Sequence, residues 1–154
     1  MSRIKRILFT DRSGNSRAPM AAALFQKMYP NAGIEALARG LVVSFPEPMN
    51  QKVEAVMAGG GIVWENFTSQ GLQDEEIKED TLVLVMDERQ KEHAIKAFTH
   101  ATADNTFVLS KYVGEELDIM DPYGGNLQTY GICFEGLKET LGKLQTRLEE
   151  DIER

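Results

Sequence analysis

A short loop near the start of the chain combines residue types that suit the binding of an anion. It reads Asp11-Arg12-Ser13-Gly14-Asn15-Ser16-Arg17 and lies between an apolar segment and a helical segment that begins near Pro19. Small hydrogen-bonding residues at such a junction leave backbone N–H groups pointing inward, and the helix N-terminus adds partial positive charge. A guanidinium such as that of Arg17 binds two phosphate oxygens at once. On residue types alone, the loop fits a phosphate site and an ordinary Ser/Gly/Asn turn with an exposed arginine about equally well.

The other reactive side chains of the sequence do not predict a second site. Cys133, the single cysteine, falls in a long helical pattern, where we expect it to be a small buried apolar residue. His93 and His100 lie seven positions apart around the end of a predicted helix and have no ligand pattern beside them, so we expect both at the surface. We therefore predict no metal site and no cofactor.

The elements that must position the loop alternate between strand and helix patterns. The predicted strands are 4–9, 34–38, 81–86 and 106–109, and the first of them leads directly into the loop. The predicted helices are 20–29 with Pro19 at the start, 50–57 ended by three glycines, a helix from 87 or 88 to about 99, and 128–149 as the longest. This alternation is typical of βαβ units, so the sequence predicts one α/β domain with a mainly parallel sheet.

Composition and charge narrow the class of protein further. The 154 residues suffice for one domain, and a single cysteine permits no disulfide within the chain, which favours a reducing, cytoplasmic location. The 17 basic and 24 acidic residues give a net charge of −7, which argues against non-specific nucleic-acid binding. The apolar run near the N-terminus is too short for a signal peptide or a membrane span. We expect no nucleic-acid and no membrane partner.

Two motifs give the chain a resemblance to the low-molecular-weight protein tyrosine phosphatases. Residues 7–25 resemble the opening of that family, which reads cysteine, five residues, arginine and then serine-proline-methionine-alanine. Asp121-Pro122-Tyr123-Gly124-Gly125 is similar to its general-acid loop, and residues 68–72 and 80–86 are similar to family segments in the same order. The resemblance implies a single flavodoxin-like domain over residues 1–154, with a four-stranded parallel sheet flanked by helices. It also implies phosphotyrosine hydrolysis without a metal.

The same resemblance implies a role for each residue of the site. The first loop position is that of the nucleophile, Arg17 grips the phosphate, and Asp121 protonates the leaving phenol. The residues implied to bind phosphate are Arg12, Ser13, Gly14, Asn15, Ser16 and Arg17. Phe45 and Tyr123 are placed to line the mouth of the site and stack on an aromatic ring, and ordinary core or rim packing explains these two residues equally well.

The loop nevertheless departs from the family pattern at several positions. The nucleophile position holds Asp11 where the family has a cysteine, and we expect the polar brace of the loop to be replaced at Gly14, Ala18 and Ala38. Ser16 stands where a second cysteine is common. Because several positions differ together, we interpret the loop as naturally diverged. Thiol-dependent arsenate reduction, which uses the same fold, is excluded because that chemistry needs several cysteines.

Three interpretations of Asp11 remain open on the sequence. In the first, its carboxylate turns into the loop, accepts the N–H groups meant for phosphate and pairs with Arg17. In the second, the loop still binds a phosphate or sulfate anion, or a phosphotyrosine, without cleaving it. In the third, Asp11 is the nucleophile of a phosphomonoesterase with Asp121 as general acid, and magnesium is the ion to add in its assay.

We predict a degenerate family member that acts by binding or regulation, with a phosphotyrosine-containing protein or a tyrosine kinase as partner. Besides this binding protein and the phosphomonoesterase, the third class of function to be tested is a purely structural interaction domain with no phosphate affinity. The three classes differ in two measurements, namely release of phosphate from an aryl phosphate and binding of phosphate itself.

Overall fold

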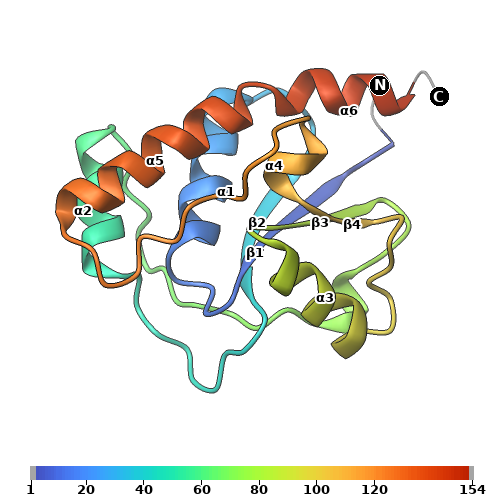
Figure 1. Cartoon of the computed structure of the whole chain (residues 1–154), viewed down its shortest axis with the longest axis horizontal. Coiled ribbons are helices and arrows are strands. Elements are labelled where there is room, and N and C mark those ends of the chain that lie inside the picture. The colour runs from blue at the N-terminus through green and yellow to red at the C-terminus, as the bar shows by residue number, and fades with distance from the viewer. Residues whose placement is uncertain (1–2, 153–154) are drawn as a thin grey trace.

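A four-stranded parallel sheet forms the centre of the computed structural model, which describes residues 3–152 (Figure 1). Its strands are β1 (Arg6–Asp11), β2 (Glu35–Gly40), β3 (Thr81–Val85) and β4 (Thr106–Val108). They lie side by side in the order β2-β1-β3-β4, and each neighbouring pair is parallel. The predicted single α/β domain with a four-stranded parallel sheet flanked by helices is therefore confirmed.

Helices cover both faces of this sheet. They are α1 (Arg17–Met28), α2 (Gln51–Gly59), the 3₁₀ turn η1 (Asp74–Glu76), α3 (Glu88–Ala97), α4 (Leu109–Tyr112), α5 (Leu127–Leu141) and α6 (Leu144–Ile152). In Figure 1, α1, α5 and α6 lie on one side of the sheet and α3 on the other. No helix within residues 3–152 is long and apolar enough to cross a membrane.

The two central strands are buried on both sides, which explains why they are continuous apolar runs in the sequence. Ile7 and Phe9 of β1 belong to the larger apolar cluster, together with buried residues of α1 and α5, whereas Leu8 belongs to a second cluster on the other face. Residues of β3 alternate in the same way, with Leu84 in the first cluster and Val85 in the second. The alternation fixes the register of the sheet, because a slip of one residue exchanges the two faces.

The first strand and the first helix begin at different residues from those predicted. The strand was expected at 4–9 and runs Arg6–Asp11, and the helix begins at Arg17, so that Pro19 is its third residue. The apolar pattern ends at Phe9, but the backbone continues as strand because Thr10 and Asp11 pair with Arg39 and Gly40 of β2. Asp11 is therefore held by the sheet itself, directly before the loop.

The predicted helix at 128–149 is wrong as a single element, because it divides into α5 and α6 at Gly142 and Lys143. Glu115 joins the end of α5 to the break itself, accepting hydrogen bonds from Thr140 Oγ1 and Lys143 Nζ at 2.7 Å each. The buried leucines of the two helices keep a helical spacing across the turn, so the sequence pattern does not show the interruption.

Candidate functional site

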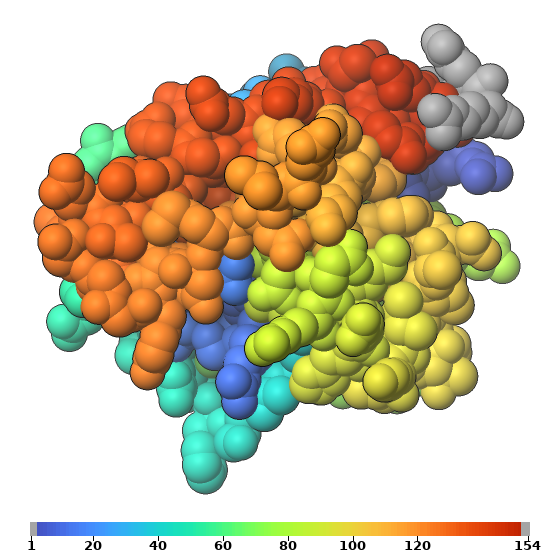
Figure 2. Space-filling view, viewed as in Figure 1, coloured from blue at the N-terminus to red at the C-terminus, as the bar shows by residue number. Residues whose placement is uncertain are grey.

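A cleft of about 520 Å³ opens at the carboxyl ends of β1 and β2, where the loop after β1 leads into α1. Side chains of the loop, of the segment before α2 and of the segment before α5 surround it: Asp11, Arg12, Ser13, Asn15, Ser16, Arg17, Glu47, Asn50, Asp121, Tyr123 and Tyr130. In Figure 2 blue atoms of the loop lie between cyan atoms of the 41–50 segment and orange atoms of the segment before α5. Ligands of open α/β sheets commonly bind at this edge.

The carboxylate of Asp11 is turned into the loop. It is 3% exposed, and its Oδ2 accepts a hydrogen bond of 2.9 Å from the backbone N–H of Ala18, the second residue of α1. Its Oδ1 accepts from the backbone N–H of Gly14. Ser16, which precedes α1, provides no side-chain cap, so the carboxyl group of Asp11 accepts the N–H group at this helix N-terminus in its place.

The loop is tightly packed against the end of β2. Gly14 has a φ of +79°, and a Cβ added to it would lie 2.9 Å from the backbone nitrogen of Gly40. A Cβ on Gly40 would lie 2.6 Å from the carbonyl carbon of Ser13. Ala38, which we expected at the position of a polar brace after the second strand, lies within β2 opposite Phe9. The loop is thus held by close backbone contact with Gly40 and by the carboxylate of Asp11.

Arg17 is directed toward the segment that carries Asp121. Its Nη1 donates to the carbonyl oxygen of Ile119 at 2.8 Å, and its Nη2 lies 3.9 Å from Oδ2 of Asp121. The side chain of Arg17 is only 5% exposed, whereas that of Asp121 is 63% exposed. The first interpretation of Asp11 included a pairing with Arg17: the charge of Arg17 acts on the carboxyl of Asp11, but within residues 3–152 no ion pair or hydrogen bond joins the two side chains.

Cys133 lies beneath the same segment, on α5. Its Sγ donates to the carbonyl oxygen of Met120 at 3.6 Å, and the residue is 1% exposed, in agreement with the small buried role predicted for it. Burial raises the pKa of the thiol to about 11, although the charge of Arg17 opposes the shift. A buried thiol with a raised pKa is a poor nucleophile, so Cys133 does not substitute for a loop cysteine.

Three residues of the cleft were not predicted from the sequence. Asn50 caps α2 and donates its backbone N–H to the carbonyl oxygen of Asn15 in the loop at 3.1 Å. Its side chain lies 3.5 Å from the hydroxyl of Tyr130 on α5. Glu47 accepts a hydrogen bond of 3.1 Å from Asn15 Nδ2. Of these three residues only Asn50 gave a signal in the sequence, because asparagine is a common residue at a helix N-cap. Tyr130 and Glu47 gave none, because their contacts join segments far apart along the chain.

The two aromatic residues assigned to the mouth of the site have different positions. Tyr123 lines the cleft and is 88% exposed. Phe45 is 76% exposed but does not belong to the lining of the cleft. Of the six residues implied to bind phosphate, five line the cleft, and Gly14 is buried with its N–H given to Asp11. His93 and His100 are exposed, as predicted.

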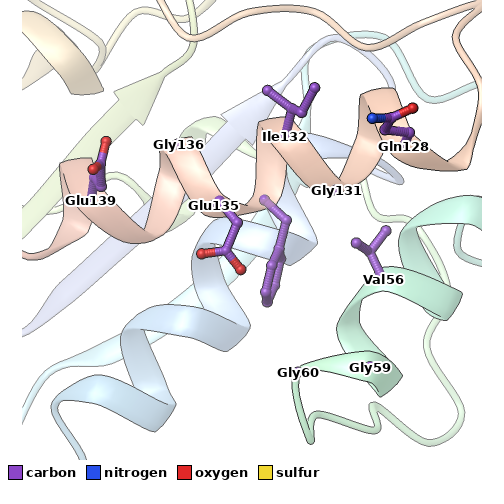
Figure 3. A pocket seen from close by; sticks show the side chains of 10 residues that line it. Val56, Gly59, Gly60, Gln128, Gly131, Ile132, Glu135, Gly136 and Glu139 are labelled. Atoms are coloured by element: carbon purple, nitrogen blue, oxygen red, sulfur yellow. The ribbon is translucent and has the colours of Figure 1, made fainter.

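A second hollow, of about 710 Å³, lies between α2 and α5 and contains none of the predicted site residues (Figure 3). Val56, Ile132 and Phe134 give it an apolar lining, and Gly59, Gly60, Gly131 and Gly136 leave it open. Within residues 3–152, no group of three or more His, Cys, Asp or Glu side chains is arranged to hold a metal ion.

Asp11 gives folding stability a specific dependence on pH. Burial raises the pKa of its carboxyl above the ordinary 3.8, although the N–H groups of Ala18 and Gly14 and the charge of Arg17 oppose the shift. The folded state therefore binds a proton more tightly than the unfolded state. We expect the unfolding free energy of the wild type, relative to that of Asp11→Asn, to be highest near pH 4 and to fall as the pH rises through the raised pKa.

Urea unfolding of both proteins at a series of pH values between 4 and 8 measures this difference. Asp11→Asn directs an NH₂ group at one of the two N–H donors, so its absolute stability is lower and only the change with pH is informative. A difference that stays constant or grows with pH contradicts a raised pKa for Asp11.

Comparison with known proteins gives consistent results over nearly the whole chain. A family model described as "Low molecular weight phosphotyrosine protein phosphatase" matches residues 6–154. A protein-arginine-phosphatase from Geobacillus stearothermophilus is 32% identical over 148 residues, covering 95% of this chain and 97% of that protein. The low molecular weight protein-tyrosine-phosphatase PtpB of Staphylococcus haemolyticus is 30% identical over 144 residues, covering 92% of this chain and 98% of that protein.

A solved structure also resembles the chain over nearly its whole length. It is a cysteine-to-serine mutant of the YwlE arginine phosphatase with a phosphorylated active site serine. Its TM-score is 0.85 at 28% identity, with 95% of this chain and 97% of that chain covered.

Proposed function

Because the chain belongs to the low molecular weight phosphotyrosine protein phosphatase family, we propose that it recognises phosphorylated proteins at the cleft around Asp11. In this proposal it binds or regulates its partner without cysteine-dependent hydrolysis. The observation that carries the proposal is the position of Asp11, at the first residue of the loop, with both carboxylate oxygens accepting backbone N–H groups. In the resembling YwlE structure, the active site residue that bears the phosphate was a cysteine before mutation.

Enough of the cleft remains for an anion. Ser13, Asn15 and Arg17 line it, and no residue between 3 and 152 accepts a hydrogen bond from their backbone N–H groups. The positive end of α1 and the guanidinium of Arg17 both attract an anion to the cleft. A carboxylate about 4 Å from a phosphate would oppose binding by roughly 4 kcal/mol at a surface-like dielectric.

The contacts of Asp11 favour binding over catalysis by an aspartyl-phosphate. Attack on phosphorus needs an oxygen lone pair that faces the phosphoryl group. Asp11 is 3% exposed, and its two oxygens already hold Gly14 and the start of α1. The phosphomonoesterase alternative through Asp11 and Asp121 would require a remaining lone pair of this buried carboxylate to face the phosphoryl group.

Two measurements on the wild type test the proposal. We expect no phosphate release from p-nitrophenyl phosphate, a phosphotyrosyl peptide or a phosphoarginyl peptide above background, with or without magnesium. We expect calorimetry to detect binding of at least one of the two phosphopeptides, with affinity about tenfold lower in Arg17→Lys, since lysine keeps the charge but not the planar fork. Turnover by the wild type that disappears in Asp11→Ala would establish the alternative. Absence of any phosphate affinity would leave a structural interaction domain.

A further inference from the structure

Glu47 places a fixed negative charge at the cleft. It lies between Pro46 and Pro48, whose rings restrict the backbone on both sides. Its backbone N–H donates to Ser69 Oγ at 2.9 Å, and its carbonyl oxygen accepts from the N–H of Ser69 at 2.7 Å. Ser69 is 1% exposed, so this pair of hydrogen bonds joins Glu47 to the interior of the protein. The residue is exposed but its backbone is held in place.

The side chain of Glu47 reaches the loop that would hold the phosphoryl group. Its Oε2 accepts from Asn15 Nδ2 at 3.1 Å, and Oδ1 of the same asparagine accepts from Ser13 Oγ at 2.8 Å. No Lys, Arg or His between residues 3 and 152 forms an ion pair with Glu47. Asp121 differs in this respect, because Arg17 lies 3.9 Å away and offsets part of its charge.

A carboxylate that has no ion-pair partner and lies beside a phosphate site has opposite effects on the binding of two kinds of ligand. It repels a ligand that carries only the phosphoryl charge, and it attracts a ligand in which a positive group lies close to the phosphoryl group. Resting on the proposed function, we propose that Glu47 is a specificity-determining residue. It selects phosphorylated ligands with a positive charge within reach of the phosphoryl group.

Two sources supply such a charge. One is the phosphorylated side chain itself, since phosphoarginine keeps a positive guanidinium next to its phosphoryl group. The other is an arginine beside a phosphotyrosine in the same peptide. Tyr123, which is 88% exposed at the cleft, offers a ring on which a guanidinium from either source can stack.

Calorimetry with three peptides tests the proposal: a phosphoarginyl peptide with neutral flanking residues, a phosphotyrosyl peptide flanked by arginine, and a phosphotyrosyl peptide with neutral flanking residues. The test variant is Glu47→Gln, whose amide oxygen can still accept from Asn15 Nδ2 while the charge is lost. Glu92→Gln is the matched control, because Glu92 is an exposed residue of α3 that does not line the cleft.

We expect Glu47→Gln to weaken binding of at least one cationic peptide by about two- to fivefold, the range typical of an exposed ion pair. The neutral phosphotyrosyl peptide should bind equally well or more tightly. Which of the two cationic peptides is affected identifies the source of the charge. The effect should shrink in 0.5 M NaCl, about the salt range where exposed charges are strongly screened, and Glu92→Gln should bind like the wild type.

Equal weakening of all three peptides by Glu47→Gln would overturn the proposal and make Glu47 a structural support for Asn15. A preference of the wild type for the neutral peptide over both cationic peptides would also overturn it. Failure of the wild type to bind any phosphopeptide removes the proposed function and this inference together. Failure of the inference is distinguishable from failure of the proposed function, because the two results that overturn the inference are obtained with a wild type that binds phosphopeptides.

Discussion

The Asp11→Cys variant should hydrolyse p-nitrophenyl phosphate faster than the wild type by a factor on the order of 10³ or more. The reason is that the surroundings of position 11 suit a thiolate. The N–H groups of Gly14 and Ala18 and the start of α1 would stabilise its negative charge and oppose the effect of burial on its pKa. Arg17 and Asp121 already lie at the same cleft. Steady-state release of p-nitrophenol by both purified proteins measures the ratio.

Two further variants show whether a gain in activity has the expected origin. Asp11→Ser tests the nucleophile, because a hydroxyl at this position is not ionised and should leave the protein nearly silent. Asp11→Cys combined with Asp121→Asn should lose about a hundredfold toward a phosphotyrosyl peptide, whose phenol needs a proton to leave. A folded but silent Asp11→Cys would mean that the loop conformation, as well as the nucleophile, has diverged. The wild-type assays would then decide between binding and no phosphate affinity.

Gly40→Ala should lower the free energy of unfolding by about 1–3 kcal/mol and displace the loop. A Cβ at this position would lie 2.6 Å from the carbonyl carbon of Ser13 and 2.7 Å from the nitrogen of Gly14. Both contacts are with backbone atoms, so no side-chain rotation relieves them. Urea unfolding measures the loss of stability. The same displacement should weaken any phosphate affinity of the wild type.

Gly136→Ala is the matched control for that substitution. Gly136 lies within α5, and a Cβ there meets no other atom within 4 Å. Alanine has the higher helix propensity, so we expect the free energy of unfolding to rise by about 0.5–1 kcal/mol. If Gly40→Ala is as stable as the wild type, the contact between the loop and β2 is looser than these distances imply.

Elements of the fold that are buried on both faces were predictable from the sequence, and polar strand ends and very short elements were less so. The apolar run of β3 identifies a strand because both of its faces are covered. The last two residues of β1, Thr10 and Asp11, are polar and are strand because β2 pairs with both of them and β3 pairs with Thr10. The elements η1 and α4, with three and four residues, are too short to show a hydrophobic period. Gly142 interrupts a leucine pattern that continues on both sides of it.

The site was predictable to the extent that it is contiguous in the sequence. The inward turn of Asp11 was one of three open interpretations, and it depends on N–H groups three and seven residues away. The contact of Arg17 with the carbonyl of Ile119 spans 102 positions, and residue types give no sign of such a contact. The same holds for Glu47, whose role depends on Asn15 and Ser69 in distant segments.

The carbonyl oxygens of Ile119 and Met120 have a consequence for the kinetics of association. Arg17 of α1 holds one of them and Cys133 of α5 holds the other, immediately before Asp121. The backbone N–H of Ile119 also donates to the carbonyl oxygen of Met86, the residue that follows β3, at 3.2 Å. The wall that bears Asp121 is therefore ordered before a ligand arrives. We therefore expect little conformational entropy to be lost when the cleft fills, and we expect diffusional encounter, not closure of this segment, to set the association rate.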